Sequence, residues 1–151
     1  MPATVEYSDT FRALGRFLEM IGATNDMDIA EDAGNIEISW RKGDGERGQR
    51  QFQAYEMEAM CTTARLFRGL EGGSQRYTTS ELLRILGDHL DEAEAERAII
   101  SEREGIFTVR ARTKQGEFKR SFLRSDLVTR ANENHQRRLV EQASPKPPRV
   151  A

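Results

Sequence analysis

Three cations in the second half of the chain could act together on a phosphate backbone. Two segments there alternate as strands, IFTVRART (106–113) and EFKRSFL (117–123). The alternation places four polar residues on the face opposite Phe107 and Val109: Arg110, Arg112, Lys119 and Ser121. Arginine and lysine neutralise phosphates, and the affinity of such a surface falls steeply with salt.

Aromatic side chains are the other half of single-strand recognition, because bases stack on them. The aromatic residues of these two strands are expected to point to the opposite side. Arg110, Arg112 and Lys119 are therefore the candidate nucleic-acid-binding residues. The preferred alternative is a solvated face, on which these cations pair with local carboxylates such as Glu102 or Glu117.

A glycine-rich segment, GDGERG (43–48), fits the G-x-G-x-x-G pattern of dinucleotide-binding loops. Such a loop must follow a strand and open a helix, so that the phosphates meet the helix N-terminus. The segment instead leads into RQFQAY (50–55), which is typical of another strand. A flexible hairpin loop is the preferred interpretation.

No residue pattern predicts catalysis or a metal site. Cys61 lies beside Met57 and Met60 on the apolar side of a helix, whereas a nucleophilic cysteine needs a partly exposed setting that stabilises the thiolate. His89 and His135, with one cysteine, have no zinc-ligand spacing. The acidic groups are interpreted as solvated: Glu56/Glu58, Glu92/Glu94/Glu96 and Glu102/Glu104. No catalytic residue, cofactor or metal is predicted, and an enzyme with an unrecognised site is only the third interpretation.

The elements that would position these residues are predicted to occur twice, as helix, three short strands and helix. Three sets of matches support an internal repeat: LGRFL (14–18) with LLRIL (82–86) at an offset of 68 residues; Ile29, Glu31, Gly34 and Arg41 with Ile100, Glu102, Gly105 and Arg112 at 71; and Thr62 and Ala64 with Thr129 and Ala131 at 67. The halves should superpose with Leu14 on Leu82, Ile36 on Phe107 and Ile38 on Val109.

The predicted fold class is α+β, built by duplication of this helix–three-strand–helix unit. Residues 1–70 form the first αβββα repeat, residues 78–143 the second, and residues 144–151 a tail that is disordered by composition. The repeats should pack as one domain with a pseudo-twofold relation, their antiparallel sheets covered by helices on one face. Whether the sheets join edge to edge or pack separately is open.

Local signals predict several details of these elements. Ser8 or Asp9 should cap the first helix, and Thr78 and Glu81 have the spacing of a capping box. The segment NIEISWRK (35–42) alternates, which predicts a strand buried on one side. Trp40 should be largely buried there, so that Trp40→Ala costs roughly 3–5 kcal/mol.

Composition limits the class of protein and its location. The 151 residues carry a net charge of −2, with 8 Lys/Arg and 13 Asp/Glu in residues 1–75 against 15 and 12 in residues 76–151. A single cysteine favours a reducing compartment, and no segment approaches the roughly 20 apolar residues of a membrane span. We expect a soluble, cytoplasmic protein that does not enter membranes.

The order of elements is similar to that of small acidic secretion chaperones and related protein-binding modules, which are dimeric α+β proteins. This resemblance concerns element order alone and implies a protein-binding role. The sequence therefore predicts a non-enzymatic cytoplasmic protein–protein interaction or regulatory module, a homodimer with an unknown protein partner. The dimer is also expected because each half-sheet would end in unpaired edge strands. The alternative is weak, non-sequence-specific nucleic-acid binding through the basic sheet face of the second repeat.

Overall fold

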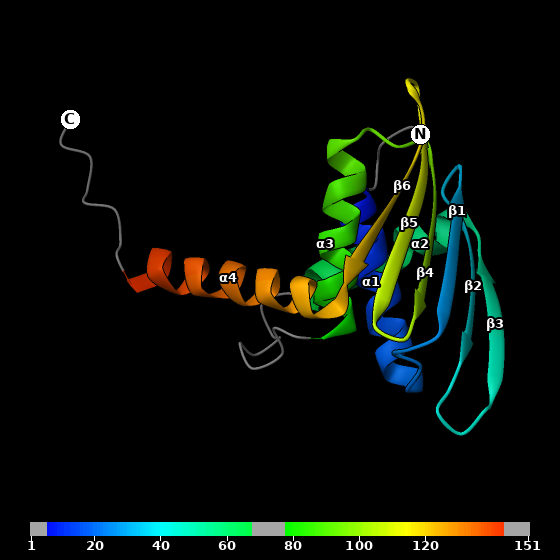
Figure 1. Cartoon of the computed structure of the whole chain (residues 1–151), viewed down its shortest axis with the longest axis horizontal. Coiled ribbons are helices and arrows are strands. Elements are labelled where there is room, and N and C mark those ends of the chain that lie inside the picture. Colours follow the sequence, from blue (N-terminus) through cyan, green and yellow to red (C-terminus); the bar gives the residue numbers. More distant parts are fainter. Residues whose placement is uncertain (1–5, 68–77, 144–151) are drawn as a thin grey trace.

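A computed structural model of the chain describes residues 6–67 and 78–143, which form an α+β fold (Figure 1). The described elements are four helices and six strands. In chain order they are α1 (Tyr7–Ile21), β1 (Met27–Asp32), β2 (Asn35–Arg41), β3 (Arg47–Phe52), α2 (Ala54–Phe67), α3 (Thr79–Glu92), β4 (Arg97–Arg103), β5 (Ile106–Thr113), β6 (Gly116–Leu123) and α4 (Arg124–Ala143).

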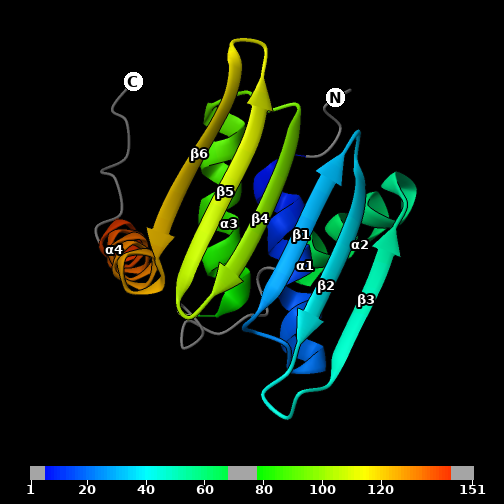
Figure 2. The same cartoon turned by 45° about the vertical axis from the view of Figure 1, so that its right-hand side comes forward.

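The six strands form one open sheet in the order β3-β2-β1-β4-β5-β6, and every neighbouring pair is antiparallel (Figure 2). Strands β1 and β4, the first strand of each half, pair at the centre of the sheet. They join the three strands of the first half to the three strands of the second. Ile29 lies opposite Ile100, and Met27 lies opposite Glu102. The question that the sequence left open is thus answered: the sheets join edge to edge rather than packing separately.

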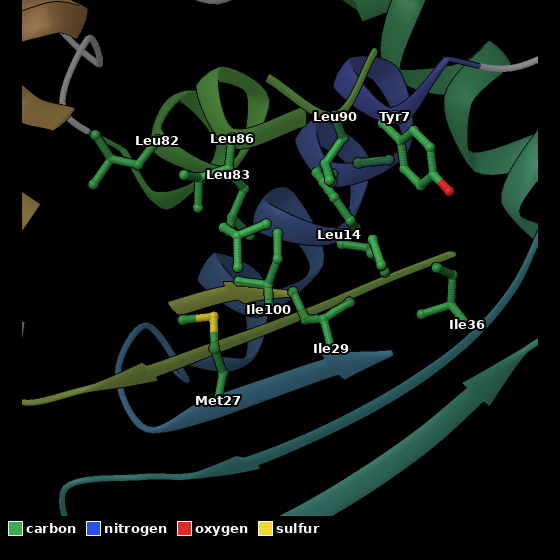
Figure 3. Packing of buried hydrophobic residues seen from close by; sticks show 14 of the residues in the cluster. Tyr7, Leu14, Met27, Ile29, Ile36, Leu82, Leu83, Leu86, Leu90 and Ile100 are labelled. Carbon is green, nitrogen blue, oxygen red and sulfur yellow. The ribbon is translucent and has the colours of Figure 1, made fainter. Parts of the chain in front are cut away.

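The helices cover one face of this sheet and enclose the core. Helices α1 and α3 pack along each other behind the central strands, and α2 packs against α1 and β2. Figure 3 shows how the apolar stripes of α1 and α3 meet the inward side chains of β1, β2 and β4. The labelled core residues are Tyr7, Leu14, Met27, Ile29, Ile36, Leu82, Leu83, Leu86, Leu90 and Ile100. Full burial of one such aliphatic side chain is worth roughly 1.5–3 kcal/mol.

Two glycines let α1 and α3 approach closely where they cross. A Cβ atom added to Gly15 would lie 2.4 Å from the Cα atom of Ser80, and one added to Gly87 would lie 2.6 Å from the Cα atom of Ser8. Both obstacles are backbone atoms, which cannot move aside as a flexible side chain would. The absence of a side chain at these two positions therefore sets the distance between the helices.

Each of these two helices is capped at its start by a carboxylate from the other. Oδ1 and Oδ2 of Asp91 accept hydrogen bonds from the backbone N–H groups of Tyr7 (2.8 Å) and Ser8 (3.1 Å). Glu19 accepts the N–H of Ser80 at 2.8 Å. The predicted cap by Ser8 or Asp9 is wrong, because α1 begins at Tyr7 and its free N–H groups reach α3 instead. The predicted cap at Thr78 is confirmed, since its Oγ1 accepts the N–H of Glu81.

Removal of the Asp91 carboxylate should destabilise the protein. Asp91→Ala leaves two N–H groups at the start of α1 without their acceptor, and loss of a cap costs roughly 0.5–2 kcal/mol. Urea denaturation should show a lower midpoint with an unchanged slope. Glu92→Ala, at the exposed neighbouring position, is the control and should change the midpoint much less. Equal midpoints for the two variants would contradict this role of Asp91.

The hairpin of β2 and β3 differs from its prediction in two ways. Strand β3 spans Arg47–Phe52 rather than residues 50–55, because the turn closes early: Lys42 N–H donates to the carbonyl of Glu46 at 2.7 Å. Gly48 thus lies within the strand, opposite Trp40, whose ring occupies the space of a Cβ atom there. Trp40 is only partly buried, edge-on to Phe17, so the cost of Trp40→Ala should fall below the predicted 3–5 kcal/mol.

Helix α4 leaves the body of the domain. Leu127 and Ala131 are buried near its start, where it contacts α3 and β6. Its later part extends away from the sheet (Figure 1), and Leu139 and Val140 there are exposed. The expected tail, 144–151, lies outside the described residues. Within the described ranges, no helix combines the length and apolar character needed to cross a membrane.

Candidate functional site

The second face of the sheet carries the side chains that point away from the helices. We call it the open face, because no helix within residues 6–67 or 78–143 covers it (Figure 2). In β4, alternation buries Ala98, Ile100 and Glu102 and turns Arg97 and Ile99 outward. The same period of two holds in β5. The open face is therefore built from every second residue of six aligned strands.

Cations outnumber anions among the strand residues of the open face. The seven cations are Arg41, Arg47, Arg97, Arg103, Arg110, Arg112 and Lys119, and the four anions are Asp28, Asp32, Glu37 and Glu117. Two ion pairs cross the junction of β1 and β4: Arg103 with Asp28 at 2.6 Å, and Arg97 with Asp32 at 3.4 Å. Asp28 also holds the pKa of Arg103 above its ordinary value. A net excess of three positive charges thus lies on one face of a chain whose total is −2.

The three candidate cations lie together on this face without acidic partners. Arg110 and Lys119 are directly opposite each other on β5 and β6, and Arg112 is the next outward residue of β5. All three are exposed, and none forms an ion pair or a side-chain hydrogen bond within the described part of the chain. Like charges directly opposite in a sheet repel, so folding holds this cluster together at a cost.

The preferred expectation, that these cations pair with Glu102 or Glu117, is wrong. Glu102 has only 1% of its surface exposed. Side chains alternate along β4, and Glu102 shares the helix-covered face with Ala98 and Ile100. Glu117 lies opposite Arg112 but forms no ion pair with it. The register of β4, β5 and β6 therefore leaves the cluster free to meet an external anion.

A hollow of about 710 Å³ runs over the open face beside these cations. Glu37 and Gln51 line it at one end, on β2 and β3, and Arg110 and Lys119 line it at the other, on β5 and β6. Ala30, Arg97 and Ile99 line it between these ends, on β1 and β4. Prediction from sequence missed Arg97 and Ile99, although the alternation in RAIISER (97–103) was a sufficient signal.

The apolar part of the open face is aliphatic. Ile99 is 47% exposed, and the cross-strand partners Ile106 and Leu123 are 43% and 51% exposed. The aromatic residues of the strands lie on the helix-covered face, as expected for the second half: Trp40, Phe52, Phe107, Phe118 and Phe122. The described part of the open face thus offers cations and aliphatic groups but no ring on which a base could stack.

Two buried carboxylates lie behind the open face, and the sequence did not predict their burial. Glu31 accepts hydrogen bonds from the hydroxyl of Tyr7 (2.6 Å) and the N–H of Gly34 (2.9 Å). Glu102 accepts the N–H groups of Asp26 (2.7 Å) and Gly105 (2.9 Å). The interpretation of Glu102 as a solvated residue is wrong. A sequence signal for this burial was present: each tight turn has a glutamate three residues before its glycine, Glu31 before Gly34 and Glu102 before Gly105.

Burial raises the pKa of Glu31, although its bonds from Tyr7 and Gly34 act in the opposite direction. The pKa of the Tyr7 hydroxyl is also raised, by burial and by the bond to Glu31. The folded state therefore holds the Glu31 proton more tightly than the unfolded chain, in which the pKa of a glutamate is about 4.3. The resulting stabilisation is complete below that pH and is lost as the pH rises through the raised pKa.

Glu31→Gln should therefore gain stability relative to the wild type as the pH rises. Glutamine can accept the Gly34 N–H and donate to the Tyr7 oxygen, but it carries no charge that burial penalises. Urea denaturation at several pH values between 4 and 7.5 should show the difference in unfolding free energy moving in favour of the variant. A difference that does not change with pH would contradict the raised pKa.

The other candidate residues occupy structural positions. The first four residues of GDGERG (43–48) lie in the turn between β2 and β3, the last two belong to β3, and the segment opens no helix, which agrees with a hairpin. Cys61 is buried, and His135 is partly buried. The His89 ring packs against Phe122 with the ring centroids 5.0 Å apart, and burial lowers the pKa of His89. The described residues contain no group of three or more His, Cys, Asp or Glu side chains suited to hold a metal ion.

The arrangement on the open face can bind an anionic partner by charge and bury aliphatic groups beside it. The fold brings the three predicted cations together. Four further residues lie on the same face: Arg97, Ile99, Ile106 and Leu123. Comparison with known proteins adds no identity to this geometry: no family model matches the chain, and no curated protein matches it.

Proposed function

We propose that this protein is a non-enzymatic, cytoplasmic protein–protein interaction or regulatory module that binds through the open face. Its partner would be an acidic protein segment with aliphatic side chains. The observation that carries the proposal is the unpaired cluster of Arg110, Arg112 and Lys119 on the same face as Ile99 and Ile106. Anionic groups would neutralise the cluster, and aliphatic groups would cover the exposed isoleucines.

Charge and apolar area would have different roles in this interaction. Exposed ion pairs are worth only about 0–1 kcal/mol each, so the cations would supply orientation and association rate. Burial of apolar surface contributes roughly 25 cal/mol per Å², so the aliphatic residues would supply much of the affinity. The combination favours a protein partner, because a nucleic acid would bring no aliphatic groups to Ile106 and Leu123.

We also propose that the chain arose by duplication and that its halves are related by a pseudo-twofold axis at the β1–β4 junction. Reciprocal contacts support this: Gly15 meets Ser80 as Gly87 meets Ser8. The two glycines are 72 residues apart, and so are the two serines. These contacts align α1 with α3 at an offset of 72 residues. The offset of 68 that matched Leu14 to Leu82 differs from it by about one helical turn. The match of Glu19 with Asp91 as mutual caps fits the same offset.

We further propose a homodimer, for which the single sheet leaves fewer free strand edges than two separate sheets would. The β1–β4 junction already pairs two of the four strand edges that two separate sheets would have. The outer edges, β3 and β6, and the exposed Leu139 and Val140 of α4 are the surfaces that a second copy could use. Light scattering at tens of micromolar tests this, and a monomeric mass would reject it.

Weak, non-sequence-specific nucleic-acid binding is the second candidate. The exposed cluster of Arg110, Arg112 and Lys119 favours it, because three unpaired cations can follow a phosphate backbone. The aliphatic character of Ile99, Ile106 and Leu123 favours a protein segment instead.

A binding comparison separates the two candidates. The probes are an acidic–aliphatic peptide, Ac-Glu-Ser-Val-Ser-Glu-Ser-Glu-amide, and a labelled oligothymidylate, each titrated into the 15N-labelled full chain at low and moderate salt. The proposal expects the peptide to shift the amide signals of Ile99 and Arg110, with part of the affinity retained at moderate salt. Binding of the oligonucleotide alone, with log affinity falling linearly with log salt, would favour the second candidate.

A further inference from the structure

One row of side chains crosses the whole open face. The strand registers place Gln51, Glu37, Ala30, Ile99, Arg110 and Lys119 opposite one another in succession, from β3 to β6. The same six residues line the hollow of about 710 Å³. The row is ordered by chemistry: an amide and a carboxylate at one end, two aliphatic residues in the middle and two cations at the other end.

The acidic end of the row has no cationic partner. The Oε1 atom of Glu37 accepts a hydrogen bond from the amide of Gln51 at 3.0 Å, and no ion pair engages it within the described residues. The carboxylate is exposed. The two ends of this row thus present unpaired charges of opposite sign, with Ala30 and Ile99 between them.

A second copy of this chain does not fit the open face well. Two such faces would bring together the excess cations that lie on each of them, and like charges across an interface are unfavourable. A purely acidic partner would satisfy Arg110 and Lys119 but would place its far end against Glu37. The occupant that matches the whole row carries negative charge at one end, an aliphatic group in the middle and positive charge at the other.

We infer that the hollow binds an extended peptide segment that crosses the strands in a fixed orientation, with acidic residues over Arg110 and Lys119 and a basic residue over Glu37. This inference rests on the proposed protein-binding function and specifies the partner. Strands lie about 4.8 Å apart, so Arg110 is roughly 14 Å and Lys119 roughly 19 Å from Glu37 across the sheet.

The spacing of an extended peptide agrees with these distances. Side chains on one face of an extended chain recur every ~6.7 Å. When a basic residue of the peptide lies over Glu37, its next side chain that faces the sheet lies ~7 Å away, above Ala30 and Ile99. The following two lie at ~13 Å and ~20 Å, above Arg110 and Lys119. The matching sequence pattern is basic-x-aliphatic-x-acidic-x-acidic.

The test uses the 15N-labelled full chain at low salt and three peptides. The matched peptide is Ac-Lys-Ser-Val-Ser-Glu-Ser-Glu-amide. The order control, Ac-Glu-Ser-Val-Ser-Lys-Ser-Glu-amide, has the same composition with the lysine moved toward the cations. The acidic peptide, Ac-Glu-Ser-Val-Ser-Glu-Ser-Glu-amide, reports the proposed function. We expect the matched peptide to bind roughly two- to thirtyfold more tightly than the order control, because the exchange removes two exposed ion pairs, one over Glu37 and one over Arg110.

A variant at Glu37 distinguishes binding in a fixed orientation from general binding of anions to the cations. Glu37→Gln keeps an acceptor for the Gln51 amide and removes the charge. It should weaken binding of the matched peptide and strengthen binding of the acidic peptide. Equal affinities for the matched and order-control peptides, unchanged by Glu37→Gln, would overturn the orientation while leaving the proposed function intact. Failure of all three peptides to shift any open-face amide signal would overturn both.

Discussion

Gly15→Val is expected to destabilise the protein by about 3 kcal/mol or more, because it forces α1 and α3 apart. The new Cβ atom would lie 2.4 Å from the Cα atom of Ser80 and 2.7 Å from its nitrogen. Helix propensity would favour replacement of the glycine by at most about 1 kcal/mol, which is too little to offset a collision with backbone. The helices would have to separate, and the core cluster that contains Leu14 and Leu83 would loosen with them.

Chemical denaturation of Gly15→Val should show a much lower midpoint or no cooperative transition. Gly87→Val should behave in the same way, since its Cβ atom would lie 2.6 Å from backbone atoms of Ser8 and Tyr7. The matched control is Gly43→Val, because a Cβ atom there meets nothing within 4 Å. It should change stability by less than about 0.5 kcal/mol. Wild-type stability in Gly15→Val and Gly87→Val would mean that the helices cross at a greater distance.

Charge reversal of the cationic cluster is expected to remove binding without unfolding the protein. The triple variant Arg110→Glu, Arg112→Glu and Lys119→Glu turns three attractive positions of the open face into repulsive ones. None of the three side chains contributes an ion pair to the described part of the fold, so the denaturation midpoint should stay close to that of the wild type. Affinity for the acidic peptide should fall by at least tenfold, since the attractions of Arg110 and Lys119 become repulsions and Arg112→Glu adds a third negative charge beside them.

The control for this variant must change the net charge equally at another place. Arg120→Glu, Arg130→Glu and Arg137→Glu together do so, because Arg120 belongs to the helix-side row of β6 and the other two lie on α4. If both triple variants lost affinity equally, the total charge of the chain would explain binding better than the open face. Retained affinity in the open-face variant alone would reject the open face as the binding surface.

Prediction from the sequence succeeded where the signal is local. The alternation in NIEISWRK (35–42) gave β2, and the Thr78–Glu81 spacing gave the start of α3 with its cap. Periodicity also placed Arg110, Arg112 and Lys119 on a single exposed face. Each of these features depends on residues a few positions apart, which the chain order itself specifies.

Features that depend on distant residues were missed for the same reason. The start of α1 is capped by Asp91 of α3, and no pattern near Tyr7 contains that information. Burial of Glu31 and Glu102 depends on the helices that cover them and on the donors that turn toward them, the Tyr7 hydroxyl and Gly34 N–H for Glu31 and the Asp26 N–H for Glu102. The absence of an acidic partner for Arg110 follows from strand register, which periodicity does not determine.

The strand order also governs how the chain can fold. Four of the five strand pairings join neighbours in sequence across short turns, whereas only β1–β4 joins residues as distant as Ile29 and Ile100. Local hairpins close in about 1–10 μs, and a contact of long sequence separation must first overcome the entropy of a large loop. Each half can therefore acquire its hairpins independently, and we expect closure of the central junction, with the docking of α1 on α3, to be the late and rate-limiting event.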